Sequence, residues 1–140
     1  MALKTEFIGK TYPPVTYPIT KDEVVNYADA ILDDNTMYRD GTMAPPLFVV
    51  RYARELLGQS ILDPDLQLNI LMLVHGGQEY EFFAPVKFGD KITSQAKIAS
   101  MYSKQSKSGR NLDFVTVESE SKNQNGEPVC KGTWTFIIRG

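Results

Sequence analysis

Few side chains in this sequence are suited to acid–base or nucleophilic chemistry at neutral pH. The 140 residues include one histidine, His75, and one cysteine, Cys130. A single cysteine cannot form an internal disulfide and a single histidine cannot build a Cys/His zinc site, so we predict neither a metal nor a cofactor. Proton transfer would depend on His75 or on a carboxylate such as Asp33, which begins the polar run Asp33-Asp34-Asn35-Thr36.

Both of these candidates have a structural as well as a catalytic interpretation. Asp33 and Asn35 follow a segment of helical periodicity, where such side chains commonly turn the chain by bonding to nearby backbone. His75 is followed by two glycines and stands between two strand-like segments. It would serve there either as an acid–base group or as a hydrogen-bonding residue at the end of a sheet. Asp33 and His75 are the catalytic candidates, with these two structural roles as the alternatives.

Two predicted helices would position these residues. Thr20 and Glu23 have the spacing of a capping box, and apolar residues recur at helical spacing from Val24 to Leu32. A second helix begins at Pro45-Pro46, because proline is tolerated in the first turn, and Gly58 is expected to end it. The second helix is apolar over most of its circumference, which predicts that it lies inside the protein.

After Gly58 the apolar period changes from helical to two, which is typical of strands. The segments of this kind, separated by polar or glycine-containing turns, are residues 66–74, 78–86, 91–102, 112–121 and 128–138. Helices followed by a run of antiparallel strands predict an α+β fold, in which a helix packs on one face of a curled sheet. At this length we expect a single domain over residues 1–140.

The composition excludes several classes of protein. Hydrophobic residues make up 42% of the chain and charged residues 23%, as in ordinary globular domains. No apolar run reaches the roughly 20 residues that a membrane span needs. The net charge of −2 gives no basic surplus for a nucleic acid partner. The first twenty residues lack the pattern of a signal peptide, so we expect a cytoplasmic protein.

Three stretches together resemble a known family. They are residues 32–40 (Leu-Asp-Asp-Asn-Thr-Met-Tyr-Arg-Asp), 43–48 (Met-Ala-Pro-Pro-Leu-Phe) and 75–90, which begin His-Gly-Gly-Gln-Glu-Tyr and end Pro-Val-Lys-Phe-Gly-Asp. In this order they resemble the MaoC-like dehydratases, or R-specific enoyl-thioester hydratases, which have a hot-dog fold. They are most similar to the amino-terminal-half relatives, which pair with a catalytic MaoC partner. The resemblance implies a central helix wrapped by a bent antiparallel sheet.

The resemblance also implies where the catalytic groups would lie. Hydration of an enoyl thioester needs a base, an acid and a donor to the developing enolate oxygen. The family's catalytic Asp falls on Asp33 and its Asn on Asn35, whereas its His falls on Tyr38 and its oxyanion glycine on Pro46. Tyrosine, with an ordinary pKa near 10, replaces an imidazole poorly, and proline has no N–H. The resemblance therefore implies a degenerate motif.

By this resemblance, the chain is a subunit of a hydro-lyase that interconverts 3-hydroxyacyl and trans-2-enoyl thioesters of coenzyme A or acyl carrier protein. It would hold the acyl chain while a MaoC-like partner supplies the Asp and His, in a homodimer or heterodimer. Two alternatives stay open: a self-sufficient hydratase that uses Asp33 or His75, and a non-catalytic homodimer that binds acyl thioesters. The residues expected to contact the substrate are Asn35, Tyr38, Pro46, Phe48, Tyr80 and Phe82.

Three further features have a structural and a functional interpretation. Glu55, on the second helix, is either a solvated side chain or the acid that hot-dog thioesterases use. The aromatic residues from Tyr80 to Phe83 are either core or the lining of an acyl channel. The basic residues of the segment 100–110 either occupy a hairpin tip or meet the phosphates of the carrier; they are Lys104, Lys107 and Arg110.

Overall fold

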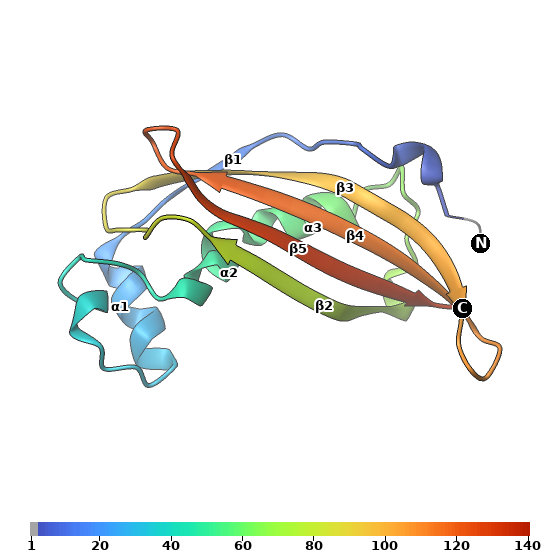
Figure 1. Cartoon of the computed structure of the whole chain (residues 1–140), viewed down its shortest axis with the longest axis horizontal. Helices are drawn as coiled ribbons and strands as arrows, with labels where there is room; N and C mark the ends of the chain where they lie inside the picture. Colours follow the sequence, from blue (N-terminus) through green and yellow to red (C-terminus); the bar gives the residue numbers. More distant parts are fainter. Residues whose placement is uncertain (1–2) are drawn as a thin grey trace.

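A five-stranded antiparallel sheet curls over a central helical segment (Figure 1). The computed structural model describes residues 3–140. The strands are ordered β1-β3-β4-β5-β2 across the sheet, so β1 and β2 form its edges. Their bounds are β1 Val15–Pro18, β2 Leu73–Phe82, β3 Lys91–Gln105, β4 Asn111–Lys122 and β5 Pro128–Arg139. This is the predicted hot-dog fold of the α+β class.

The central helical segment consists of three consecutive pieces on the concave face of the sheet. They are the 3-10 turn η3 (Pro46–Phe48) and the helices α2 (Val49–Tyr52) and α3 (Arg54–Ile61). The prediction that Gly58 ends the helix is wrong. Gly58 does not adopt the positive φ of a glycine cap, and Leu57 and Ile61 pack against the core, so the helix continues for another turn.

Helix α1 (Lys21–Ala30) begins as predicted, with the Thr20 side chain accepting a hydrogen bond from the Glu23 amide at 3.4 Å. The Glu23 carboxylate does not complete a capping box. It accepts a hydrogen bond from the Tyr17 hydroxyl and lies 4.0 Å from Arg51, so it ties the helix to β1 and α2. Figure 1 shows α1 and the loop that follows it beyond the arrowhead of β2.

The two strands predicted over residues 66–74 and 78–86 are replaced by the single strand β2. Residues 66–69 alternate like a strand, but Gln67 has a φ of 50° and Leu66 is buried in the core, so the chain turns there. The 3-10 turn η4 (Ile70–Met72) follows and leads into β2. A bulge between His75 and Gly77 interrupts the pairing of β2 with β5, so His75 lies within a strand.

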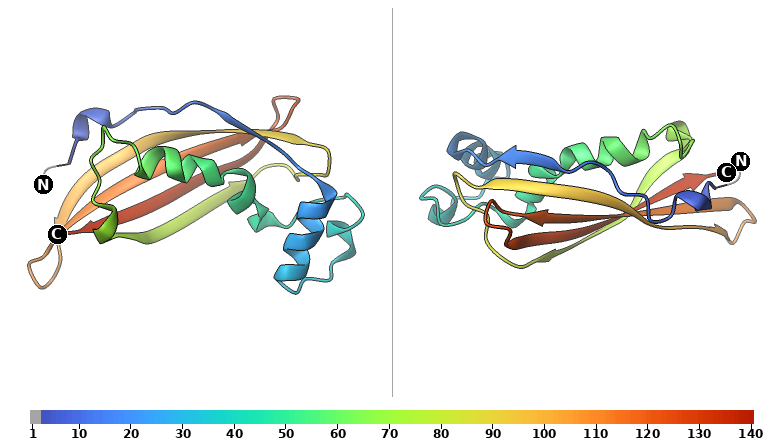
Figure 2. Two further views of the ribbon diagram at one scale, coloured as in Figure 1. Left: turned by 180° about the vertical axis from the view of Figure 1, so that it is seen from behind. Right: turned by 90° about the horizontal axis from the view of Figure 1, so that it is seen from above.

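The core lies between the concave face of the sheet and the inner side of the central helical segment. Its most buried large side chains are Phe48, Ile19, Leu56, Ile92 and Ile98. The outer side of the segment is less covered than its composition predicted: Leu47 and Val50 are 55% and 41% exposed. Figure 2 shows why, since helices cover only one face of the sheet and nothing lies outside them. Within residues 3–140, no helix has the length and apolar character needed to cross a membrane.

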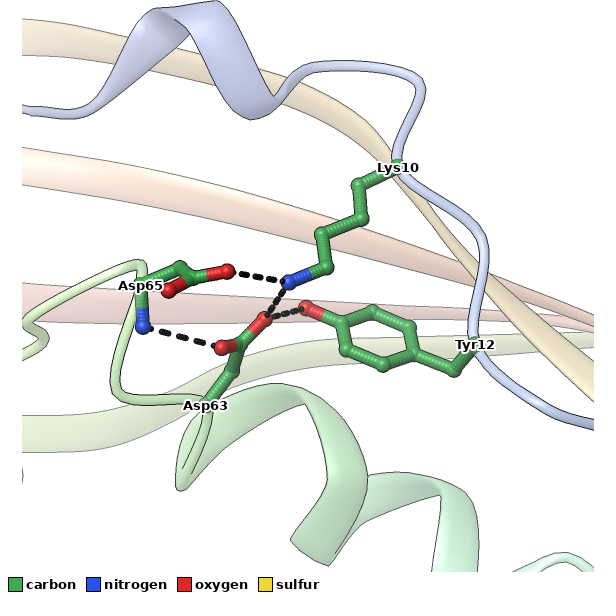
Figure 3. Close-up of polar contacts among 4 residues, drawn as sticks. All are labelled: Lys10, Tyr12, Asp63 and Asp65. Atoms are coloured by element: carbon green, nitrogen blue, oxygen red, sulfur yellow. Dashed lines mark hydrogen bonds and ion pairs between the residues drawn. The ribbon is translucent and has the colours of Figure 1, made fainter.

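A polar cluster fastens the N-terminal segment to the loop after α3 (Figure 3). The buried Asp63 carboxylate accepts hydrogen bonds from Lys10 Nζ at 2.6 Å and from the Tyr12 hydroxyl at 2.7 Å. Its second oxygen accepts from the Asp65 amide at 2.9 Å, and Lys10 also pairs with the Asp65 carboxylate. We call these four residues the Asp63 clasp. It holds segments more than 50 residues apart in the sequence against one another.

Candidate functional site

An apolar cleft opens where the central helical segment begins. Residues 43–46 and Phe48 form one wall, residues 82–86 form the other, and Tyr52 and Val129 complete the lining. The cleft has a volume of about 270 Å³. Tyr52 supplies the only polar side-chain group among these residues. An apolar cleft of this kind suits a hydrocarbon chain, because each buried methylene contributes about 0.8 kcal/mol.

The two walls are joined through the backbone. The Ala44 amide donates a hydrogen bond to the Val86 carbonyl at 2.6 Å, which fixes the spacing of the walls at one end. Phe82 and Phe83 extend from the opposite wall and are 46% and 53% exposed. Burial raises the pKa of the Tyr52 phenol, which therefore stays protonated at the side of the cleft. The cleft has one fixed end and an aromatic rim.

The loop that carries Asp33 is ordered by turns. Asp33 Oδ1 accepts a hydrogen bond from the Asn35 amide and Asn35 Oδ1 accepts one from the Met37 amide, each at 3.0 Å. The Arg39 side chain closes the loop by donating to the carbonyl oxygens of Asp33 and Asn35. Both motif side chains therefore bond to the local backbone, as the structural interpretation expects. Asn35 and Tyr38 are not among the lining residues of the cleft.

Pro46 lies at the first position of the central helical segment and lines the cleft. Pro45 precedes it, so two successive residues at this end of the helix lack an N–H. The first amides of the segment belong to Leu47 and Phe48, and the Phe48 amide is already bonded to the Pro45 carbonyl at 2.9 Å. The backbone donor that the family resemblance expects at position 46 is absent.

His75 is exposed on β2 and stacks on Phe136 with ring centroids 5.6 Å apart. It is the third residue of the strand, whereas the cleft is lined by Phe82, the last residue. Seven residues of strand span about 23 Å. The loop after α1, which includes Asp33 in the sequence, lies beyond the arrowhead of β2 and therefore at the cleft end of this strand (Figure 1). The hydrogen bond that the structure gives to the Asp33 carboxylate comes from the Asn35 amide, so His75 and Asp33 are not paired in one chain.

The bulge at Gly76 gives the concave face of β2 an unusual polar character. His75 and Gln78 both fall opposite buried residues of β5, Phe136 and Trp134, because the bulge shifts the alternation by one residue. Tyr80 follows on the same face, where its hydroxyl accepts hydrogen bonds from Trp134 Nε1 at 3.1 Å and from the Gln78 amide.

Other candidates lie outside the cleft. Glu55 is exposed on α3, away from the cleft lining. Burial raises the pKa of the Cys130 thiol to about 11, so this residue behaves as a small buried hydrophobe. Lys104 lies over the stacked rings of Tyr102 and Phe114 near the β3–β4 turn, at the far end of the sheet. Among residues 3–140, no three His, Cys, Asp or Glu side chains are grouped to hold a metal ion.

The curled sheet, the central helical segment and the cleft at its start define a MaoC-like hot-dog domain. Residues 6–132 match the family described as FAS1-like, dehydratase domain region. A UPF0336 protein from Thermobifida fusca (strain YX) is 32% identical over 151 aligned positions, covering 100% of this chain and 96% of that protein. The chain therefore belongs to the FAS1-like dehydratase-domain family, and UPF0336 proteins are among its relatives.

Solved structures with the same fold include two complexes from Mycobacterium tuberculosis. A chain of the C-terminally truncated HadBC (3R-hydroxyacyl-ACP dehydratase) complex superposes with a TM-score of 0.78 at 23% identity, covering 96% of this chain and 99% of that one. A chain of the ChsH1-ChsH2 complex gives 0.75 at 18% identity, covering 92% and 88%. At these identities the superpositions establish the fold alone. The family resemblance read from the sequence is confirmed by the match of residues 6–132 to the family.

Eight of the residues that line the cleft were not expected from the sequence to contact a ligand: Met43, Ala44, Pro45, Tyr52, Ala84, Pro85, Val86 and Val129. Tyr52 follows the apolar pattern of the helix and Val129 the alternation of a strand, so neither differs from an ordinary core residue. The expected Pro46, Phe48 and Phe82 do line the cleft. Tyr80 lies beside it, with its ring centroid 5.9 Å from that of Phe82.

Proposed function

We propose that this chain is the acyl-holding subunit of a hydro-lyase that interconverts 3-hydroxyacyl and trans-2-enoyl thioesters. The carrier would be coenzyme A or an acyl carrier protein. The observation that carries the proposal is the start of the central helical segment, where a dehydratase-family domain keeps an apolar cleft but has two prolines in place of a backbone donor. Binding is retained while one part of the catalytic machinery is missing.

The remaining catalytic parts would come from a MaoC-like partner. Asp33 and Asn35 bond to their own loop, and Tyr38 stands where the family has its imidazole. A base and an acid must nevertheless act on the water and on the α-carbon. A second hot-dog domain that brings its own Asp and His to this cleft would supply both groups.

The free edge of the sheet gives such a partner a place to bind. Within the part of the chain that the structure describes, β2 pairs only with β5, and its other edge carries unpaired backbone groups. Leu71, just before β2, is 91% exposed, and Leu47 and Val50 are exposed on the central helical segment. Covering this edge and this apolar surface favours a homodimer or a heterodimer.

An assay of the chain alone and mixed with a candidate MaoC-like subunit tests the proposal. Hydration of a short and a long trans-2-enoyl thioester is followed by loss of the enoyl absorbance. We expect the chain alone to bind the thioesters without turnover, and the mixture to turn over faster than either component. Failure of the chain to bind either thioester, alone or in the mixture, would contradict the proposal.

A further inference from the structure

Tyr80 is held in one position by its neighbours on the sheet. Its hydroxyl oxygen accepts a hydrogen bond from Trp134 Nε1 at 3.1 Å and a second from the Gln78 side-chain amide. An indole N–H can only donate, so the direction of the Trp134 bond is fixed. Trp134 is 2% exposed, which places this donor inside the protein and makes the bond costly to lose.

The Tyr80 ring occupies a space that a glycine keeps open. A Cβ on Gly132, opposite Tyr80 on β5, would lie 2.9 Å from Cε1 and 3.0 Å from Cδ1 of the ring. Any larger residue at position 132 would therefore push the ring away from the sheet. The ring packs beside Phe82, which lines the cleft, with centroids 5.9 Å apart. The ring that carries the hydroxyl is therefore held against a side chain of the cleft wall.

The proton of this hydroxyl is still available. A tyrosine hydroxyl has one hydrogen to donate and two positions that accept, and Trp134 and Gln78 use both accepting positions. Among residues 3–140, no hydrogen bond has the Tyr80 hydroxyl as its donor. Burial raises the pKa of the phenol, so it keeps its proton at neutral pH. Tyr80 is only partly buried.

We infer that Tyr80 is a substrate-binding donor, whose hydroxyl donates a hydrogen bond to the thioester carbonyl oxygen of the acyl ligand in the cleft. The inference rests on the proposed function and adds a named group to it. Two accepted hydrogen bonds polarise a hydroxyl and strengthen the bond that it donates. The side chain would then provide the donor that Pro46 cannot provide from the backbone.

Binding of two ligands that differ in one carbonyl group tests this role. The probes are trans-2-octenoyl-pantetheine and S-(trans-2-octenyl)-pantetheine, a thioether that keeps the double bond and has no carbonyl. The pantetheine arm is common to coenzyme A and acyl carrier protein. Tyr80→Phe removes only the hydroxyl. We expect it to weaken binding of the thioester about tenfold and to leave binding of the thioether unchanged, as for loss of one hydrogen bond. Binding is measured by calorimetry on the assembly that binds the thioester most tightly.

A matched variant, Tyr102→Phe, makes the same change at a tyrosine that stacks on Phe114, outside the cleft lining. It should alter neither affinity, and unchanged thioether binding shows that the Tyr80→Phe protein is folded. In a mixture that turns over, Tyr80→Phe should also lower kcat about 10²–10³-fold, as for loss of one oxyanion donor. An equal effect on both ligands, or none on the thioester, would overturn the role of Tyr80 while the proposed function stands. Absence of thioester binding by the wild-type protein would overturn both.

Discussion

Three residues determine what this site can do without a partner. Pro46 is the first residue of the central helical segment and lines the cleft, but it has no N–H to donate there. Asp33 bonds to the Asn35 amide and so stabilises a turn. Tyr38, at the position where the family resemblance implies a histidine, lies in the short turn that follows Asn35. The Asp33 carboxylate is thus present but bonded to its own turn, whereas positions 38 and 46 lack an imidazole and a backbone N–H.

The variant Asp33→Asn tests whether Asp33 is a turn residue or a catalytic base. Asparagine accepts the same backbone hydrogen bond, so we expect less than about a twofold change in turnover by the most active assembly. A catalytic base at this position would instead lose about 10²–10⁴-fold. Steady-state kinetics of the variant and wild type, with circular dichroism as the control for folding, distinguish the two. A loss in the upper range with intact folding would show that Asp33 acts in the reaction.

The double variant Pro46→Gly with Tyr38→His restores the two missing groups. Glycine returns a backbone N–H to the helix start, and histidine returns an acid–base group to the loop beside Asp33. We expect measurable hydratase activity in a chain that is inactive by itself, and each single variant should gain less than the pair. Wild-type activity equal to that of a complete hydratase would show that these two positions are not the missing parts.

At the scale of elements, the Asp63 clasp fixes the N-terminal segment to the end of the central helix. Burial alone would raise the pKa of the Asp63 carboxyl, but the hydrogen bonds from Lys10 and Tyr12 outweigh it, so the pKa lies below its ordinary value. A pKa that is lower in the folded state stabilises the fold above the unfolded value of about 4. This contribution is lost as the pH falls through the folded-state pKa.

Asp63→Ala should therefore lower the free energy of unfolding by about 1–3 kcal/mol at pH 7, because the buried Tyr12 hydroxyl loses its acceptor. The difference from wild type should stay constant down to about pH 5 and shrink below pH 4. Asp65→Ala is the control: its side chain is 56% exposed and should contribute less than about 1 kcal/mol. Urea titrations at one protein concentration measure both variants, and a difference that grows toward low pH would contradict this assignment.

The elements were predictable from the sequence where local signals agree with packing. Turn residues such as Gly89 and Gly126, both with positive φ, mark the ends of β3, β4 and β5 closely. The alternation of residues 66–69 misled the prediction because Leu66 turns into the core, which depends on tertiary packing.

The cleft could be predicted only in part, since its walls come from segments about 40 residues apart. The Trp134–Tyr80 bond depends on the register of β2 with β5, which a bulge shifts.

In the molecule as a whole, β2 has a free edge and the outer side of the central helical segment is uncovered. We predict that the purified chain is a dimer at micromolar concentration, because a monomer with a net charge of only −2 would leave this surface in water. Sedimentation velocity measures the state directly. A stable monomer with no tendency to associate would contradict the prediction.

Two substitutions locate the interface. Val50 on the helix and Tyr102 on β3 are equally exposed, at 41% and 40%. Val50→Asp should weaken association at least tenfold, since it places a charge on the side of the helix that a second domain would cover. Tyr102→Asp should not, because Tyr102 lies outside this surface, among the residues of β3. The reverse result would place the interface on the other face of the sheet.

We propose that this chain contributes a binding cleft and that a second subunit contributes the acid and the base. Continuous variation tests it most directly: hydratase activity on one trans-2-enoyl thioester is measured while the mole fraction of this chain rises from zero to one at fixed total concentration. We expect a maximum near equal amounts of this chain and the MaoC-like partner, and no activity at a mole fraction of one. A maximum at a mole fraction of one would contradict it.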